Sequence, residues 1–158
     1  MKKINLFLPA LIICMFFTDI LYADYKILID HTSTNLSQIP DSEIAAAKTD
    51  LHIAYQHTSH GSQLISGMSA LEAYPDFGNK YEWSDSGSGG LDLDYSGIPG
   101  VNDLSEGDSI VEGVTPWVTA TRILLDNPAN NHVNVIMWSW CSINGHNARR
   151  YVDHMEIV

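Results

Sequence analysis

The sequence is poor in basic residues and in cysteine. It has 8 Lys and Arg against 19 Asp and Glu, which gives a formal net charge of −11 at pH 7. A surface this acidic repels phosphate groups, so nucleic acid and anionic lipid headgroups are excluded as partners, and a neutral or cationic substrate is favoured. The two cysteines, Cys14 and Cys141, are too few for the disulfide framework of a small secreted domain. Stability must therefore come from a packed core, for which 45% hydrophobic residues are sufficient.

Long apolar runs are also missing, with one short exception at the N-terminus. Two lysines precede an apolar run over residues 4–17, and Asp19 ends it before the roughly 18 residues that a membrane span requires. Ala23 supplies the small residue of a cleavage site. We therefore predict a signal peptide over residues 1–23, cleaved after Ala23. The protein would be exported to the periplasm or the medium without stable membrane anchoring; an uncleaved anchor is the alternative.

The remaining residues, 24–158, have the length of one domain and alternate short apolar runs with helical patterns. This order predicts a single α/β domain with a parallel sheet. The expected strands are 27–29, 51–55 and 133–140, and the expected helices begin at Asp41, after Gly61, at Pro116 and near Ala148. Asp41 and Thr115 are expected to cap the first and third of these helices.

Two regions depart from this alternation. Residues 74–113 are rich in Gly, Ser, Asp and Pro, so we expect a long irregular excursion, which its aromatic side chains would make an ordered lid or wall. The helix that begins near Ala148 runs to Val158 without a following strand. We therefore expect the domain to be incomplete at its C-terminus.

A serine stands where a strand gives way to a helix. The segment His57-Thr58-Ser59-His60-Gly61 follows the strand predicted over 51–55, and helical spacing resumes directly after it. A serine in such a turn exposes its hydroxyl, while backbone amides and the helix N-terminus stabilise developing negative charge. The segment thus predicts a nucleophilic serine for acyl transfer. The alternative is that Ser59 or Ser62 only caps the helix.

Residues 51–61 and the helix after them resemble the first block of the SGNH (GDSL-like) esterases, with His57 and Thr58 in place of the family's Gly-Asp. The His-Thr-Ser-His-Gly block, together with Trp-Ser-Trp-Cys at 138–141, also resembles a group of uncharacterised secreted bacterial proteins of SGNH-like appearance. The resemblance covers most of residues 24–158. It implies a three-layer, flavodoxin-like (SGNH-type) parallel sheet with flanking helices, and a serine esterase that needs no cofactor.

The resemblance also implies roles for individual residues. Ser59 matches the nucleophile, and its own amide matches one donor of the oxyanion hole. Gly90, or another glycine of its cluster, is the candidate for the family's oxyanion-hole glycine. Asn144 or Asn147, beyond the last predicted strand, is the candidate for the asparagine.

The catalytic base is left open by the sequence. The family's Asp-x-x-His pair has no counterpart after the last predicted strand. Either the pair belongs to a missing segment, or His57 and His60 supply the base, or the chain is not a hydrolase. Residues 107–110 literally spell the family's first block and offer Ser109 as a rival nucleophile, and residues 100–103 spell its third block, but neither follows an apolar strand.

Two tryptophans and a cysteine end the last predicted strand. Trp138 and Trp140 should share one face of it, opposite Ser139, where they either wall the pocket or belong to the core. Cys141 is expected to be a small buried residue beside them. A thiol nucleophile activated by His146 is the alternative for Cys141.

Metal binding is the remaining class of site. His57 and His60 stand three apart, but a pair is short of a ligand set, and the acidic loop over residues 85–94 lacks the ordered spacing of a calcium site. We therefore expect no metal. The sequence predicts a secreted or periplasmic serine ester hydrolase that acts on acyl or acetyl esters. The resemblance implies that these are esters of carbohydrate. The alternative is a non-catalytic secreted protein that binds glycan or peptide on the same scaffold.

Overall fold

The computed structural model describes residue 30, residues 32–106, residue 110 and residues 113–158. The chain divides into two compact units, residues 1–36 and residues 37–158. In the described part of the first unit, the carboxylate of Asp30 accepts a hydrogen bond of 2.8 Å from the backbone N–H of Thr32. The predicted signal peptide and the strand predicted over 27–29 lie outside the described residues. Over the described chain, no helix is both long and apolar enough to cross a bilayer.

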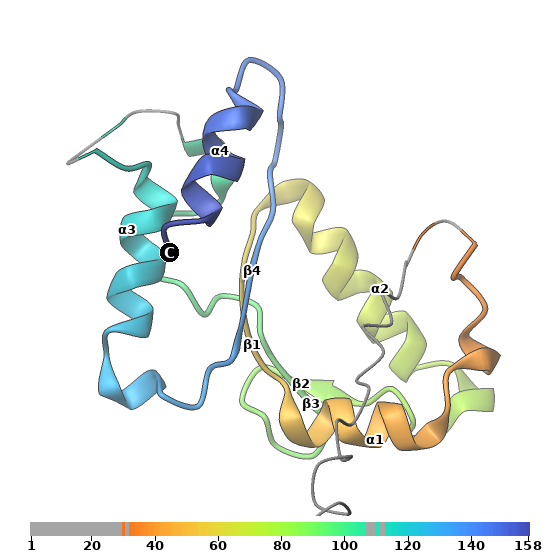
Figure 1. The fold of residues 1–158 in the computed structure, drawn as a ribbon. Helices are drawn as coiled ribbons and strands as arrows, with labels where there is room; N and C mark the ends of the chain where they lie inside the picture. Colours follow the sequence, from red (N-terminus) through yellow and green to blue (C-terminus); the bar gives the residue numbers. More distant parts are fainter. Residues whose placement is uncertain (1–29, 31, 107–109, 111–112) are drawn as a thin grey trace, which may run out of the picture. The chain divides into compact units, whose positions relative to one another are not determined.

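The second unit is an α/β domain, and its described residues form one four-stranded, all-parallel sheet. The strands are β1 (His52–Gln56), β2 (Trp83–Ser84), β3 (Leu91–Asp94) and β4 (Val135–Trp138). Their order is β2-β3-β1-β4, so β1 lies between β3 and β4 (Figure 1). Ile53 shows the register, since it pairs with Leu93 of β3 and with Val135 of β4.

Helices cover both faces of this sheet. They are α1 (Asp41–Asp50), α2 (Ser62–Glu72), α3 (Pro116–Leu125) and α4 (Ala148–Met155). Successive residues of a strand point to opposite faces, so Tyr55 packs in a cluster with Met68 of α2, while Ala54 packs with Ala120 and Leu124 of α3. Figure 1 shows α2 and α3 on opposite sides of β1 and β4. The predicted parallel α/β sheet with flanking helices is confirmed at this level.

Most predicted elements are present with small shifts of their ends. β1 begins one residue after the start of the predicted strand. α3 begins at Pro116 with Thr115 at the N-cap position, as expected, but the Thr115 hydroxyl makes no capping hydrogen bond and pairs with His154 instead. β4 is shorter than the strand predicted over 133–140. It stops at Trp138; Ser139 still donates its N–H to the carbonyl of Gln56 at 3.3 Å, but its own carbonyl accepts from Leu104 N at 3.0 Å, outside the strand ladder.

The expected cap of α1 is wrong. Pro40 holds the N-cap position, because its extended backbone, with φ of −60° and ψ of 143°, leads directly into the helix. Asp41 is instead the first helical residue, where its carboxylate pairs with Lys80 Nζ at 2.6 Å. An acid in the first turn still stabilises the helix through its dipole.

The expectation of an irregular segment over residues 74–113 is wrong in part, because this segment supplies β2 and β3. In β3 the side chains alternate: Leu93 is buried among apolar residues, whereas Asp92 turns to the other face and lies 2.7 Å from the imidazole of His52. Aspartate has low strand propensity, and β3 is only four residues long. β3 forms because it pairs with β1 and because His52 of β1 contacts the carboxylate of Asp92. Both contacts are long-range in sequence, so local sequence does not predict them.

Candidate functional site

The carboxyl end of β1 is the place where this sheet can bind a ligand. Its two neighbours are β3 and β4, and the chain reaches β3 after α2 and β4 after α3, helices on opposite faces. The loop after β1 leads to α2 on one face, whereas the loops after β3 and β4 lead to α3 and α4, which pack together on the other face. In open parallel sheets, ligands bind outside the carboxyl ends of the strands at such a point. The predicted nucleophile follows β1 at this edge.

Ser59 has an unusual backbone conformation. It is the only non-glycine residue with positive φ, 42°, in the described parts of the chain. It opens a 3₁₀ turn, Ser59–Gly61, that leads directly into α2, and its side chain is exposed. The hydroxyl of Ser62 donates to the carbonyl of Ser59 at 2.6 Å. A non-glycine residue in this conformation costs about 1–3 kcal/mol, and such strain concentrates at functional sites.

Gly61 lets the turn approach β4 closely. A Cβ on Gly61 would overlap the hydroxyl oxygen of Ser139 and lie 2.5 Å from the Cβ of His57. Tyr55, in β1, donates its hydroxyl to the carbonyl of Gly61 at 3.1 Å. The turn is therefore packed between β1 and the residue that follows β4, and only glycine fits at its third position.

A buried carboxylate holds the same region together. Asp103 is 2% exposed and belongs to the loop after β3. Its carboxylate accepts hydrogen bonds from the hydroxyl of Thr58, from the hydroxyl and the N–H of Ser105, and from the N–H of Cys141 at 3.1 Å. Burial alone would raise the pKa of Asp103, but these hydrogen bonds from Ser105, Thr58 and Cys141 together lower it. Asp103 is thus an anion that joins the Ser59 turn to the loop after β4.

His60 is oriented by that second loop. Its Nδ1 lies 2.7 Å from the carbonyl oxygen of Cys141. A carbonyl oxygen only accepts, so Nδ1 carries the proton in the neutral ring and Nε2 carries the lone pair. His60 is exposed, next to Ser59 in the chain. In the neutral ring, Nε2 is therefore the nitrogen that can accept a proton.

His57 has a different environment. Its ring stacks on Tyr55, with centroids 4.7 Å apart, and neither ring nitrogen has a hydrogen-bond partner among the described residues. Burial lowers the pKa of His57, against a smaller opposing effect of the Asp103 charge. The ring is therefore neutral at pH 7. The buried hydroxyl of Ser139 also lacks a partner within the described chain.

Gly90 is not where the resemblance needs it. It precedes β3, so it lies at the amino ends of the strands, whereas Ser59 follows the carboxyl end of β1. Its role is close packing: a Cβ there would lie 2.5 Å from the backbone of Glu82, which leads into β2. Gly97 is the glycine that follows β3. The assignment of Gly90 to the oxyanion hole is therefore wrong.

The predicted residues at the end of β4 and directly after it point to opposite faces of the sheet. Trp138 and Trp140 pack with the cluster of Trp117 and Tyr151 between α3 and α4, while Ser139 faces Gly61. The shared face of the two tryptophans is confirmed, and both are partly buried against this cluster. The indole N–H of Trp138 donates to Thr121 at 3.0 Å.

Asn144, Asn147 and Cys141 lie in the loop that follows β4. Asn144 is exposed, and Asn147 is the N-cap of α4, where its side-chain oxygen accepts from the N–H of Arg150 at 3.2 Å. Cys141 is half-buried, and its backbone, through the contacts to Asp103 and His60, is the part that reaches the site. Within the described residues, no group of three or more His, Cys, Asp or Glu side chains is placed to hold a metal ion.

Sequence reasoning missed Asp103. It stands in the Gly-Val-Asn-Asp tetrapeptide at 100–103, which resembles a family block but follows no long apolar run. The clue available was an acid two residues before a serine, Ser105, a spacing at which an aspartate can accept from the backbone N–H two residues on. Residues 107–109, which include the rival serine, lie outside the described part of the chain. Comparison with protein-family models, with curated proteins and with solved structures finds no match for this chain.

Proposed function

We propose that this protein is an exported serine ester hydrolase of the SGNH type, with Ser59 as nucleophile. The observation that carries the proposal is the conformation of Ser59: an exposed serine held at positive φ between the carboxyl end of a central parallel strand and a helix. Strain of this kind persists where the presented side chain is needed. The N-terminus of α2 also supplies positive potential beside the hydroxyl.

In the first half of the reaction, Ser59 Oγ bonds to the acyl carbon and its proton passes to Nε2 of His60. Collapse of the tetrahedral intermediate expels the alcohol, which takes that proton. Water then attacks the acyl-enzyme with His60 again as base, and the carboxylic acid leaves as Ser59 regains its proton. The hydrogen bond from His60 Nδ1 to Cys141 supports this role, because it holds the lone pair on Nε2.

Developing negative charge on the acyl oxygen needs donors. The backbone N–H of Ser59 is the first, at the start of the 3₁₀ turn. Asn144 and Asn147, in the loop after β4, stay the predicted side-chain donors, and Asn147 also caps α4.

Asp103 is a positioning residue in this proposal. It binds Thr58, immediately before the nucleophile, and the N–H of Cys141, whose carbonyl orients His60. One buried anion therefore links nucleophile and base without touching the substrate. His57, neutral and stacked on Tyr55, forms the wall behind the turn and is the second candidate for the base.

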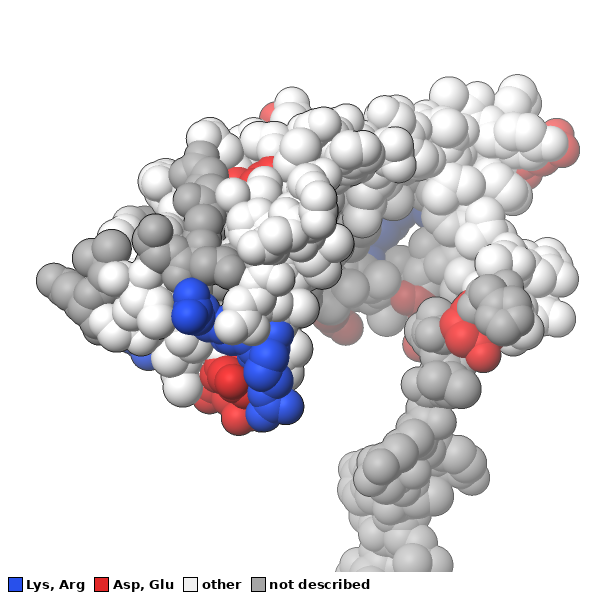
Figure 2. Space-filling model, turned by 90° about the horizontal axis from the view of Figure 1, so that it is seen from above, with Lys and Arg blue, Asp and Glu red and all other residues white. Residues whose placement is uncertain are grey.

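The strand order supports the SGNH type within the α/β class. If the two-residue β2 is left out, the strand order is β3-β1-β4. The first strand then lies between the second and the third, as in flavodoxin-like sheets. An ester of an uncharged alcohol suits the net charge of −11. Figure 2 shows one mostly uncharged face, on which the basic side chains in view lie beside acidic ones. Acyl or acetyl esters of carbohydrate are the proposed substrates.

The first test is hydrolysis of a short-chain nitrophenyl ester by the wild type and by Ser59→Ala, His60→Ala and His57→Ala. Loss of a general base lowers kcat by about 10²–10⁴-fold. We expect that loss for His60→Ala, complete loss for Ser59→Ala, and a smaller effect for His57→Ala. Ser62→Ala serves as the matched variant, since its hydroxyl only donates to the Ser59 carbonyl. Equal activity of Ser59→Ala and Ser62→Ala would refute the assignment of the nucleophile.

One observation favours a second function, a secreted glycan- or peptide-binding protein. Among the described residues, no hydrogen bond joins Ser59 Oγ to a histidine, while the nitrogens of His57 and the hydroxyl of Ser139 are buried and unpartnered. Unpaired polar atoms at a loop edge can be satisfied by a ligand. Saturable binding of an oligosaccharide, with wild-type affinity in Ser59→Ala and no ester hydrolysis, would establish this function instead.

A further inference from the structure

One asparagine in the loop after β4 is followed by glycine. Asn144 and Gly145 are both exposed. They lie between Cys141, whose carbonyl orients His60, and Asn147, the N-cap of α4. No other asparagine of the sequence precedes a glycine. The pair therefore places a side-chain amide next to a backbone N–H that carries no side chain to shield it.

The fold leaves both groups of this pair open to reaction. The N–H of His146 donates to the carbonyl of Ile143 at 3.2 Å, which closes a turn with Asn144 and Gly145 at its centre. Gly145 has a positive φ of 85°, and a Cβ built on it meets no atom within 4 Å. In the described chain, neither the N–H of Gly145 nor the side-chain amide of Asn144 has a hydrogen-bond partner.

Other asparagines of the domain have their side chains engaged. Oδ1 of Asn134 accepts from the N–H of His52 at 2.9 Å, and its Nδ2 donates to the carbonyl of Asp50 at 2.5 Å. The side chain of Asn147 accepts from the N–H of Arg150 at 3.2 Å. Such hydrogen bonds hold an amide in place, so it does not turn toward the next backbone nitrogen.

We propose that Asn144 deamidates spontaneously in the folded protein. The backbone nitrogen of Gly145 bonds to Cγ of Asn144, and the side-chain nitrogen leaves as ammonia together with the proton of the Gly145 N–H. Water then opens the cyclic imide at either of its carbonyl groups, which leaves aspartate or isoaspartate at position 144. Glycine favours the first step because it has no Cβ to hinder the approach of the nitrogen.

The reaction changes the charge at the edge of the sheet that holds Ser59. An amide can donate a hydrogen bond to an oxyanion, whereas a carboxylate only accepts and is itself negative. This consequence rests on the proposed function, in which Asn144 is a candidate oxyanion donor. Loss of one such donor lowers kcat by about 10²–10³-fold. Deamidation therefore inactivates the esterase irreversibly as the protein ages.

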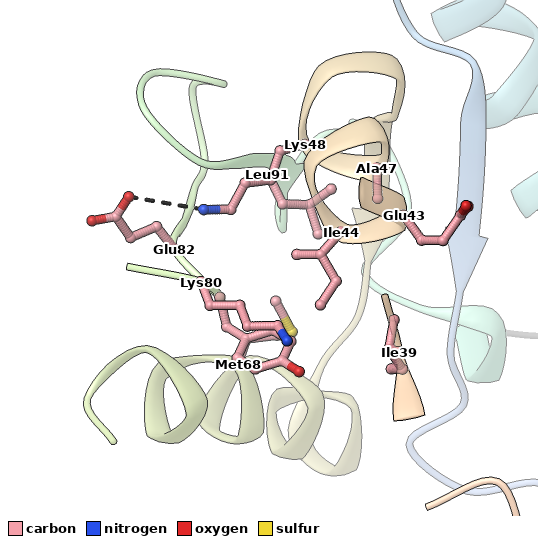
Figure 3. Close-up of a pocket in the computed structure, with 10 residues that line it drawn as sticks. Ile39, Glu43, Ile44, Ala47, Lys48, Met68, Lys80, Glu82 and Leu91 are labelled. Atoms are coloured by element: carbon pink, nitrogen blue, oxygen red, sulfur yellow. Dashed lines mark ion pairs between the residues drawn. The ribbon is translucent and has the colours of Figure 1, made fainter. Parts of the chain in front are cut away.

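Asn79 is the matched asparagine for comparison. It is also exposed, but Lys80 follows it in the sequence. Its carbonyl accepts from Lys48 Nζ at 2.6 Å and from the N–H of Glu82 at 3.4 Å, and Figure 3 shows Lys48 paired with Glu82. Asn79 precedes β2, so it lies near the amino ends of the strands, whereas Ser59 follows a carboxyl end.

The test incubates the purified full chain at mildly alkaline pH, digests it in acid, and follows the peptides of Asn144 and Asn79 by mass spectrometry. We expect Asn144 to convert at least about tenfold faster than Asn79, because glycine leaves the attacking nitrogen open. The rate at Asn144 should be similar in urea, where the turn is lost. Asn144→Gln should show no conversion at this position, and the ammonia released by the wild type should match its converted fraction.

Two results would overturn the proposed modification. One is an equal rate at Asn144 and Asn79, and the other is a rate in the folded protein more than about tenfold below that in urea, which would show that the fold protects the turn. Conversion is read by mass, so this result does not depend on whether the protein hydrolyses esters.

The inactivation is measured separately. Hydrolysis of the nitrophenyl ester should fall in proportion to the converted fraction, and Asn144→Asp should show the loss from the start. Full activity in Asn144→Asp would refute the inactivation while the modification itself stands. A fresh wild-type protein without any activity would instead contradict the proposed function.

Discussion

Cys141 donates its backbone N–H to the carboxylate of Asp103 across 3.1 Å, so a buried anion in the loop after β3 holds the loop after β4. The same carboxylate accepts from Thr58, the residue before Ser59. The carbonyl of Cys141 in turn fixes the ring of His60. The geometry of the proposed nucleophile and base therefore depends on one side chain that contacts neither of them.

Asp103→Asn should be strongly destabilising. The amide keeps one acceptor oxygen and turns an NH₂ group toward donors that the carboxylate now satisfies, and hydrogen bonds to a charged group are worth about 1.5–3 kcal/mol each. We expect the free energy of unfolding in urea to fall by about 2 kcal/mol or more. Asp126→Asn, at the exposed end of α3, should change it by less than about 0.5 kcal/mol. Similar effects of the two substitutions would contradict the network described for Asp103.

The stability of the protein should fall in acid because of Asp103. Its pKa is lowered in the folded state, so its contribution is fully present above the unfolded value of about 3.9 and is lost as pH falls through the lower folded value. The urea midpoint of the wild type should therefore decrease below about pH 4. The decrease should be smaller in Asp103→Asn. Parallel profiles for both proteins would show that this carboxyl does not carry the acid sensitivity.

Ser59→Gly should stabilise the fold while it removes the nucleophile. Glycine adopts φ of 42° without the clash that a Cβ causes, and relief of such strain is worth about 1 kcal/mol or more, less the greater freedom of glycine in the unfolded chain. Ser59→Ala keeps the Cβ and should gain nothing. Thermal melting of the two variants at one pH compares them directly. A melting temperature of Ser59→Gly at or below that of Ser59→Ala would argue against strain at this residue.

Gly61→Ala should have the opposite effect on the same turn. The added Cβ meets the Ser139 hydroxyl and the His57 Cβ, and overpacking of this kind costs about 1–3 kcal/mol. Gly67→Ala, in α2 with open space around it, should be neutral or stabilising by up to about 1 kcal/mol through helix propensity. Adding Ser139→Ala to Gly61→Ala should restore part of the loss. The measurement is urea unfolding of the wild type, the two single variants and the double variant. If the double variant is no more stable than Gly61→Ala, the contact with Ser139 is contradicted.

The sequence predicted the elements that carry strong local signals. The apolar run before His57 and the helical spacing after Gly61 are enough to place a serine at a strand-to-helix turn, and Pro116 marks the start of α3. β3 has no such signal, since its two aspartates oppose strand formation until β1 provides a ladder and His52 a partner. For the same reason the prediction for Gly90 named the wrong end of the sheet. Gly90 directly precedes β3, and the local sequence does not predict that strand.

The candidate site could be predicted only where it is local in the chain. Ser59 and His60 are neighbours, so one block of sequence contains both. Asp103 and Cys141 enter from the loops after β3 and β4, and their meeting depends on which strands flank β1. No spacing along the chain encodes that choice. The positive φ of Ser59 and the close approach of Gly61 to Ser139 are likewise tertiary features that a single sequence does not show.

The most direct measurement is to map the site of covalent labelling by a fluorophosphonate, which displaces fluoride when an activated serine oxygen bonds to phosphorus. Peptide mass spectrometry of the labelled protein should find one adduct, on Ser59. The adduct should be absent in Ser59→Ala, and labelling should be slowed in His60→Ala and retained in Ser62→Ala. An adduct on another serine, such as Ser109, or a wild-type protein that stays unlabelled, would contradict the account.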